Sequence, residues 1–136
     1  MLHYSVHEEV AEWADANMHR AEAIIEDAIR QGGWKTNITK SQLYGLQNSL
    51  ELGTSYFHKH INDGMLKSEK RNRQDLVTLF QSLVNASEWI AADAKTMASR
   101  LKGRRYAKDE IIGLLWKKFF QHVLAHALYL DRTRSQ

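Results

Sequence analysis

The sequence predicts an all-α protein, folded as a single-domain bundle of about four to five helices. Few positions can break a helix, because the 136 residues include no Pro and only 7 Gly. Apolar residues make up 43% of the chain and recur mostly at helical spacing. The length suits one domain, spanning residues 1–136. We therefore expect long helices packed around one hydrophobic core.

The composition also excludes several classes of site. Without Cys the chain has no disulfide, no thiolate zinc site and no Cys nucleophile. This fits a reducing compartment, and we expect a cytoplasmic protein. The first residues lack the basic and apolar regions of a signal peptide. The most apolar segment, residues 111–130, is interrupted by Lys, Gln and His, so we expect no membrane partner.

The first helix is expected over residues 5–30. Ser5 and Glu8 form the Ser-x-x-Glu pattern of a capping box. Apolar residues then recur every three or four positions, so one face packs and acidic residues line the other. The stretch "QGGW" at 31–34 ends this helix.

The second helix is expected to begin at Thr39, which serves as N-cap with Gln42 three residues on. Gly53 is expected to allow a close approach of another element, and "NDG" at 62–64 to stop the helix. The predicted buried stripe consists of Leu43, Leu46, Leu50, Phe57 and Ile61.

Two more helices complete the predicted bundle. The third is expected over about 68–102, and a length of about 35 residues favours a kink or break near 85–87. Gly103 is its expected C-cap. The fourth, over about 108–132, is apolar nearly all round and is therefore expected to be the central helix. The stripe of the third helix consists of Leu76, Phe80, Leu83, Ser87, Ile90, Ala94, Met97 and Leu101.

His122 and His126 are spaced like the two zinc ligands of a His-Glu-x-x-His helix. Val123 stands where that motif has its general base, and no third ligand is apparent. A metal-dependent helical enzyme is therefore a weak alternative. We expect no metal and no cofactor, and two histidines that hydrogen-bond locally.

Other catalytic patterns are absent from the sequence. The chain has no Gly-x-Ser-x-Gly, no phosphate-binding P-loop and no Gly-x-Gly-x-x-Gly. It also lacks the Arg followed by His four to six residues later that marks helical HEPN ribonucleases. We therefore expect no catalytic residues and a protein that is not an enzyme.

Charge is distributed unevenly along the chain, although the net charge is only +3. Residues 1–30 contain seven acidic residues and two Arg, a net charge of −5. Residues 95–136 contain ten basic and three acidic residues, a net charge of +7. Such asymmetry favours contacts between copies, or an anionic partner at the basic end.

Two basic clusters are the main functional candidates. The first, "KSEKRNR" at 67–73, is predicted at a helix start, where the helix dipole disfavours cations unless an anion binds. The second, "SRLKGRRYAK" at 99–108, sets Arg beside Tyr106, which suits phosphate contact with base or sugar stacking. An ordinary solvated turn explains it equally well. Lys40 adds one more cation. The candidate RNA contacts are Lys40, Lys67, Lys70, Arg71, Arg73, Arg100, Arg104, Arg105 and Lys108.

Two stretches resemble the small α-helical subunit of type III CRISPR effector complexes. "NITKSQLYGL" at 37–46 is similar to the Thr/Ser-rich helix start of that family. "FFQHVLAHALYLDR" at 119–132 is similar to its C-terminal helix. The sequence departs from the family at Tyr44, where a basic residue is usual, and at His122 and His126, which stand at Glu and Tyr positions.

The resemblance implies a non-catalytic subunit in antiviral defence. Such a subunit stacks in several copies, as a filament, beside the other effector-complex subunits that hold the guide RNA. Its basic face lines the groove for the target RNA and contacts the backbone of the guide and target duplex, while base pairing reads the sequence.

A protein-interaction module is the alternative from a different class. A phage inhibitor or an antitoxin-like bundle would use the acidic first helix to mimic nucleic acid. In that case Glu8, Glu9 and Glu12 would matter for partner binding and the basic clusters would not.

Overall fold

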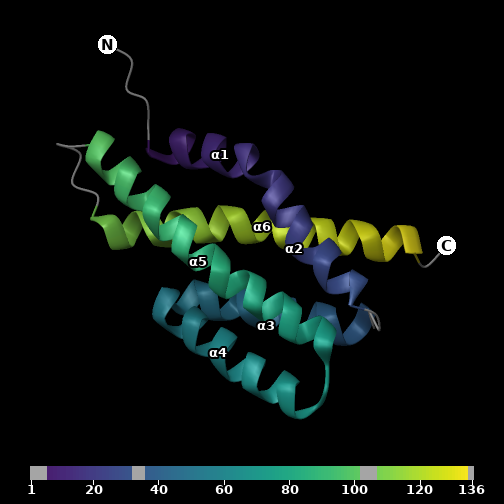
Figure 1. The fold of residues 1–136 in the computed structure, drawn as a ribbon. Helices are drawn as coiled ribbons and strands as arrows, with labels where there is room; N and C mark the ends of the chain where they lie inside the picture. The colour runs from purple at the N-terminus through teal and green to yellow at the C-terminus, as the bar shows by residue number, and fades with distance from the viewer. Residues whose placement is uncertain (1–5, 32–35, 102–106, 135–136) are drawn as a thin grey trace.

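Six α-helices make up the part of the chain that the structure describes. The structure is a computed structural model that describes residues 6–31, 36–101 and 107–134, and within these the side chains of all but 36–40 and 134. The all-α class is confirmed, but the helices number six instead of four to five. In chain order they are α1 (Val6–Ala16), α2 (Met18–Arg30), α3 (Thr36–Leu52), α4 (Thr54–Lys70), α5 (Gln74–Arg100) and α6 (Lys108–Arg134) (Figure 1).

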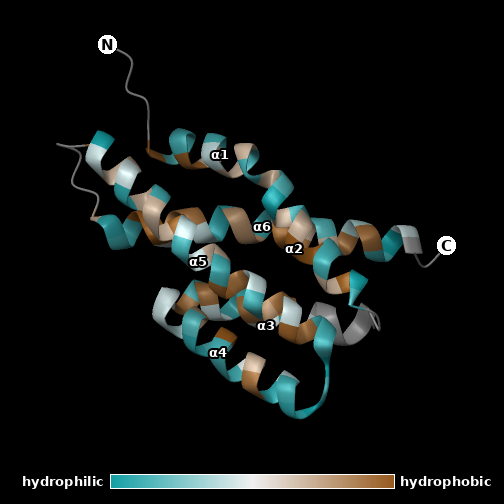
Figure 2. Ribbon diagram, in the orientation of Figure 1, coloured by the Kyte–Doolittle hydropathy of each residue, from teal (hydrophilic) through white to brown (hydrophobic). Residues whose placement is uncertain are grey.

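Helix α6 is the centre of the bundle, as its apolar sequence predicts. It contacts α1, α2, α3 and α5, whereas α4 lies at the outside against α3 and α5 (Figure 1). The apolar residues of the helices turn towards these contacts (Figure 2). Trp116 and Phe120 of α6 are buried and meet Phe57 of α4, with ring centroids 4.7 and 5.7 Å from it. Their burial and edge-on packing stabilise the middle of the core.

Helices α1 and α2 are separated at Asn17, so the single helix expected over 5–30 is wrong. Asn17 has φ −104° and ψ 10°, outside helical values. Its side-chain amide donates a hydrogen bond of 2.8 Å to the Trp13 carbonyl, which offers the backbone an alternative to the next helical bond. The proposed cap at Ser5 lies outside the described residues.

Trp13 attaches the N-terminal helices to the rest of the bundle. Its indole Nε1 donates a hydrogen bond of 2.8 Å to Asp93 Oδ2 on α5. Its ring packs between Trp89 of α5 and Phe119 of α6, at centroid distances of 6.0 and 6.1 Å. The Arg20 guanidinium covers Trp89 at 4.5 Å. These contacts bury large aromatic surfaces while satisfying the indole N–H.

A break at Gly53 divides the expected second helix into α3 and α4. Gly53 has φ 138° and ψ 158°, a combination open almost only to glycine. The expected close approach at Gly53 is wrong, because no atom lies within 4 Å of a Cβ placed there. Helix α3 already begins at Thr36, so Thr39 lies within it and is not its N-cap. The predicted stripe from Leu43 to Ile61 is buried throughout.

Gly64 provides the close approach that was expected of Gly53. The stretch "NDG" at 62–64 does not stop the helix, and α4 continues to Lys70. A Cβ on Gly64 would lie 2.5 Å from Cζ of Phe80, which is fully buried on α5. Glycine is therefore needed at this position for packing between α4 and α5 and not for a turn.

Helix α4 ends in a Schellman motif. Asn72 takes a left-handed conformation with φ 55°. The N–H of Arg73 donates to the Ser68 carbonyl at 3.0 Å, and the N–H of Asn72 donates to the Glu69 carbonyl at 3.2 Å. The helix expected over 68–102 is therefore wrong at its start: α5 begins at Gln74, after this turn.

Helix α5 is shorter than expected and runs without a break through 85–87. It contains 27 residues, because six residues assigned to its start belong to α4 and to the turn. The predicted stripe is buried from Leu76 to Met97, except that Ser87 is half-buried. The expected C-cap at Gly103 lies outside the described residues. Helix α6 has the start that was expected for it and continues two residues further, to Arg134.

Gly64→Ala is expected to destabilise the protein by about 1–3 kcal/mol, because the methyl group overpacks the contact with Phe80. Gly113→Ala on α6 is the matched control. No atom lies within 4 Å of its Cβ position, so it should stabilise the helix by about 0.5–1 kcal/mol. Urea unfolding measures both changes. Equal effects of the two substitutions would contradict the close approach at Gly64.

Candidate nucleic-acid interface

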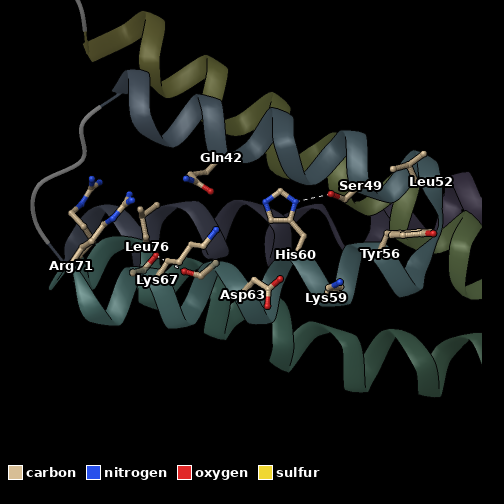
Figure 3. Close-up of a pocket in the computed structure, with 13 residues that line it drawn as sticks. Gln42, Ser49, Leu52, Tyr56, Lys59, His60, Asp63, Lys67, Arg71 and Leu76 are labelled. Carbon is tan, nitrogen blue, oxygen red and sulfur yellow. Dashed lines mark hydrogen bonds between the residues drawn. The ribbon is translucent and has the colours of Figure 1, made fainter.

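A groove between α3 and α4 gathers the residues of the first basic cluster. We call it the basic groove; its volume is about 440 Å³. It extends from Tyr56, near the Gly53 turn, to Arg71 at the far end of α4 (Figure 3). The lining residues are Gln42, Ser49, Leu52, Tyr56, Lys59, His60, Asp63, Gly64, Lys67, Ser68, Arg71, Arg73 and Leu76.

One face of α4 supplies most of this lining. Tyr56, His60, Asp63, Lys67 and Arg71 follow one another at intervals of three or four residues, which places them in one row along a helix. The opposite wall is formed by residues of α3, from Gln42 to Leu52 (Figure 3). The row spans 15 residues, a rise of about 22 Å.

The basic groove carries three cations that form no ion pair within the described residues. Lys59, Lys67 and Arg71 are exposed, and none of them forms an ion pair within the described part of the chain. Asp63 is the single acidic residue among those lining the groove in the described residues. Cations collected in a concave site attract an anionic ligand more strongly than cations spread over a flat surface.

Arg73 pairs with a carboxylate of the fold, unlike Lys59, Lys67 and Arg71, the other cations that line the groove. Its Nε and Nη2 donate hydrogen bonds of 3.0 and 2.8 Å to the two carboxylate oxygens of Asp75. Asp75 is only 3% exposed, so this fork satisfies a buried charge in the first turn of α5. The hydrogen bonds to Asp75 raise the pKa of the Arg73 guanidinium. Arg73 is therefore charged at any pH at which the protein folds.

His60 lies in the middle of the groove and is held by Ser49 (Figure 3). Ser49 Oγ lies 2.6 Å from His60 Nδ1 and 3.1 Å from the Gly45 carbonyl oxygen, and the tautomer of His60 decides which partner donates in the Ser49–His60 hydrogen bond. Burial lowers the pKa of His60 below its usual value; Asp63 opposes this shift and Lys67 adds a smaller lowering. The lowered pKa favours the neutral imidazole.

Ser49, His60 and Asp63 have the residue types of a catalytic triad but not its geometry. An activated serine donates its proton to the histidine, which acts as general base. A triad also needs a carboxylate that hydrogen-bonds and orients the histidine, and within the described residues no hydrogen bond joins His60 to Asp63. The contact with Ser49 holds the imidazole in place, but the triad is incomplete.

Three residues of the first basic cluster, Lys67, Lys70 and Arg71, lie at the end of α4, so the helix start expected for them is wrong; only Arg73, the N-cap of α5, lies at a helix start. Lys67 and Lys70 occupy the last turn of α4, where the helix dipole favours cations. Lys67 and Arg71 line the groove together with Arg73, whereas Lys70 is exposed beside it. The helix dipole therefore gives no reason to expect a bound anion at these residues. The gathering of cations in the groove does give one.

The described members of the second basic cluster, Arg100 and Lys108, lie at the other end of α5 and the start of α6 (Figure 1). The 27 residues of α5 place Arg100 about 40 Å from the first cluster, so the two cannot form one site. Arg100 forms an ion pair of 2.6 Å with Glu9 of α1. Lys108 is exposed at the first residue of α6. The side chains of Lys40, Arg104 and Arg105 lie outside those that the structure describes.

His122 and His126 face the acidic N-terminal helices. His122 Nε2 lies 3.3 Å from Asp15 Oδ1, and His126 Nε2 lies 3.5 Å from Glu26 Oε1. Both contacts are within ion-pair distance, but His126 Nε2 is buried without a hydrogen bond, so the expectation of local hydrogen bonding is wrong for His126. In the described part of the chain, His, Asp and Glu do not gather in any group of three or more that could hold a metal ion.

A second hollow, of about 520 Å³, lies between α1 and the end of α5. Glu9 and Arg100 line it and pair with each other across it. Glu12 also lines this hollow and leaves it with a net negative charge, so it attracts an anion less than the basic groove does.

Tyr56, Lys59 and His60 belong to the groove but were not predicted as functional residues. The helical spacing from Tyr56 to Arg71 was a usable signal. It was hidden because the helix was expected to stop at 62–64, which separated Lys59 from Lys67.

The chain matches no family model, no curated protein and no solved structure. The candidate interface is therefore argued from its own geometry. In addition, none of the described helices has an apolar stretch of the length needed to cross a membrane.

Arg73→Gln is expected to destabilise the protein by about 2–3 kcal/mol, because it leaves the buried Asp75 carboxylate without its partner. Arg71→Gln, two residues away and without an ion pair, should change stability by less than about 0.5 kcal/mol. Adding Asp75→Asn to Arg73→Gln should restore part of the loss. Urea unfolding of the native protein and the three variants measures these changes; no recovery in the double variant would contradict the buried pair.

Stability is expected to fall on acidification partly through His60. Its lowered pKa means that the unfolded chain binds the proton first, near its usual pKa of about 6.5. The contribution of His60 is therefore complete above about pH 6.5 and lost as pH falls through its folded pKa. Between about pH 7.5 and pH 5, the free energy of unfolding should fall less in the His60→Gln variant than in the native protein, as measured by urea unfolding. His19→Gln, at an exposed position on α2, controls for removing a histidine.

Proposed function

We propose that this protein is a non-catalytic RNA-binding subunit that contacts the RNA backbone through the basic groove. The observation that carries the proposal is the row of Lys59, Lys67 and Arg71 in one groove without ion pairs. Cations of this kind supply most of the affinity of proteins for nucleic acid, and they do so without base specificity.

The resemblance of residues 37–46 and 119–132 to the small α-helical subunit of type III CRISPR effector complexes supports a particular setting. In that setting the protein stacks in copies beside the subunits that hold the guide RNA, and its groove faces the target RNA. The basic groove lies partly on α3, the helix in which the first of these stretches is found.

The alternative, an acidic protein-interaction helix, has less support. Glu9 is paired with Arg100, and Asp15 and Glu26 face histidines of α6. Acidic side chains that already face a basic side chain of the same protein are less available to mimic nucleic acid. The cations of the basic groove remain open to a partner.

Replacing Lys67 and Arg71 by Gln is expected to weaken binding of the protein to single-stranded RNA. The slope of log K against log salt should become shallower by about 1.4, because about one phosphate contact is lost per residue and each contributes about 0.7 on a single strand. Fluorescence anisotropy between about 50 and 200 mM salt measures both effects.

The matched control replaces Lys117 and Lys118 of α6 by Gln. This change removes the same charge from exposed positions outside the basic groove. If both double variants lose affinity equally, RNA binding depends on total charge and the assignment to the groove is wrong. Arg104→Glu with Arg105→Glu tests the second basic cluster in the same assay.

A further inference from the structure

We infer that the basic groove takes a single-stranded RNA segment and that the Tyr56 ring stacks on one unpaired base. This inference rests on the proposed function and adds to it the form of the RNA. It is carried by the position of an unpartnered aromatic ring at one end of a row of cations.

Tyr56 is 61% exposed, so most of its surface is open to solvent. Leu52, across the Gly53 turn, is 72% exposed and also lines the groove. Within the described residues Tyr56 has neither a ring contact nor a hydrogen bond. Tyr129, exposed to a similar degree, stacks on His126 instead. Tyr56 therefore has a free ring face beside the groove.

The cations continue from this ring along α4. Lys59 follows Tyr56 by about one helical turn, a rise of about 5 Å, and Lys67 and Arg71 lie further along the same face (Figure 3). A base on Tyr56 thus places its phosphate near Lys59 and the next phosphates towards Lys67. Such a combination of stacking and backbone contact is typical of proteins that bind single strands without sequence preference.

The same geometry disfavours a duplex. Paired bases are stacked on each other, so their faces are closed to a protein side chain. The groove volume of about 440 Å³ is in the range of small-molecule sites, roughly 300–1,000 Å³, and suits a nucleotide-sized unit better than a double helix.

The experiment titrates the protein with an oligouridylate of about 12 nucleotides. Tyr56→Ala should weaken binding about 10-fold or more, whereas Tyr56→Phe should stay close to the native protein. Tyr44→Ala is the matched control, since Tyr44 is 43% exposed on α3 but does not line the groove. An abasic oligonucleotide of equal length should bind the native protein about 10-fold more weakly and should not distinguish Tyr56→Ala from it.

The outcomes separate the stacking of a base on Tyr56 from the proposed function on which it rests. If Tyr56→Ala binds like the native protein while the Lys67 and Arg71 variant does not, stacking is wrong and the proposed function stands. Equal binding of an RNA duplex, or an equal loss in Tyr44→Ala, also overturns the stacking. If neither the aromatic nor the cationic variants lose affinity, the proposed function fails too. The abasic comparison uses native protein, so it decides the question even if a variant does not fold.

Discussion

The turn at Gly53 is the constraint on which the candidate site depends. Its φ of 138° lies in a region that is essentially closed to residues with a Cβ, so the chain can reverse there only with glycine. The reversal brings α4 back along α3 and makes the two helices the walls of one groove. A continuous helix over the same residues would carry the same cations on a convex surface. The concavity, and with it the focusing of positive potential, comes from one backbone conformation.

The second end of α4 is built by a different kind of interaction. Asn72 closes the helix in a Schellman motif, and Arg73 then bridges to the buried Asp75 at the start of α5. This order explains why neighbouring cations in "KRNR" have different roles. Arg73 is committed to a carboxylate inside the fold, while Arg71 has no such partner and extends into the groove. Charge density in the sequence does not reveal this division, because it depends on where the helix ends.

Much of the fold could be predicted from the sequence, because helical periodicity is a local property. The buried stripes and the central helix over 108–132 were predicted correctly on this basis. The roles of the glycines were not predicted correctly. Gly53 was expected to allow a close approach, and the "NDG" that contains Gly64 was expected to stop the helix, but the structure shows the reverse. Within a helical pattern, a glycine can either end the helix or allow a close approach of another helix. The choice for Gly64 depends on Phe80 of another helix, a contact that no local pattern contains.

The helix end wrongly expected at 62–64 also limited the prediction of the site. Lys67 and Arg71 were found because they cluster in sequence, but Lys59 and Tyr56 were separated from them by a helix boundary that does not exist. Basic residues at the far end of α5 were grouped with them by charge alone. Distance along a rigid helix of 27 residues excludes one shared site, although nothing in the composition does.

The groove separates residues that face a ligand from residues that hold the walls. Gly64, Ser68 and Arg73 line it, but they also pack on Phe80, hydrogen-bond the backbone or neutralise Asp75. Substituting any of them changes the shape of the groove and the stability of the bundle together. The side chains of Tyr56, Lys59, Lys67 and Arg71 are exposed and make no polar contact within the described residues, so their removal leaves the fold intact. A loss of binding at these four positions therefore reports on recognition, whereas a loss at the other three does not discriminate. In a preformed binding site, the side chains that meet the ligand are exposed and do not stabilise the fold, while other side chains beneath them hold the walls in place. The groove has this arrangement.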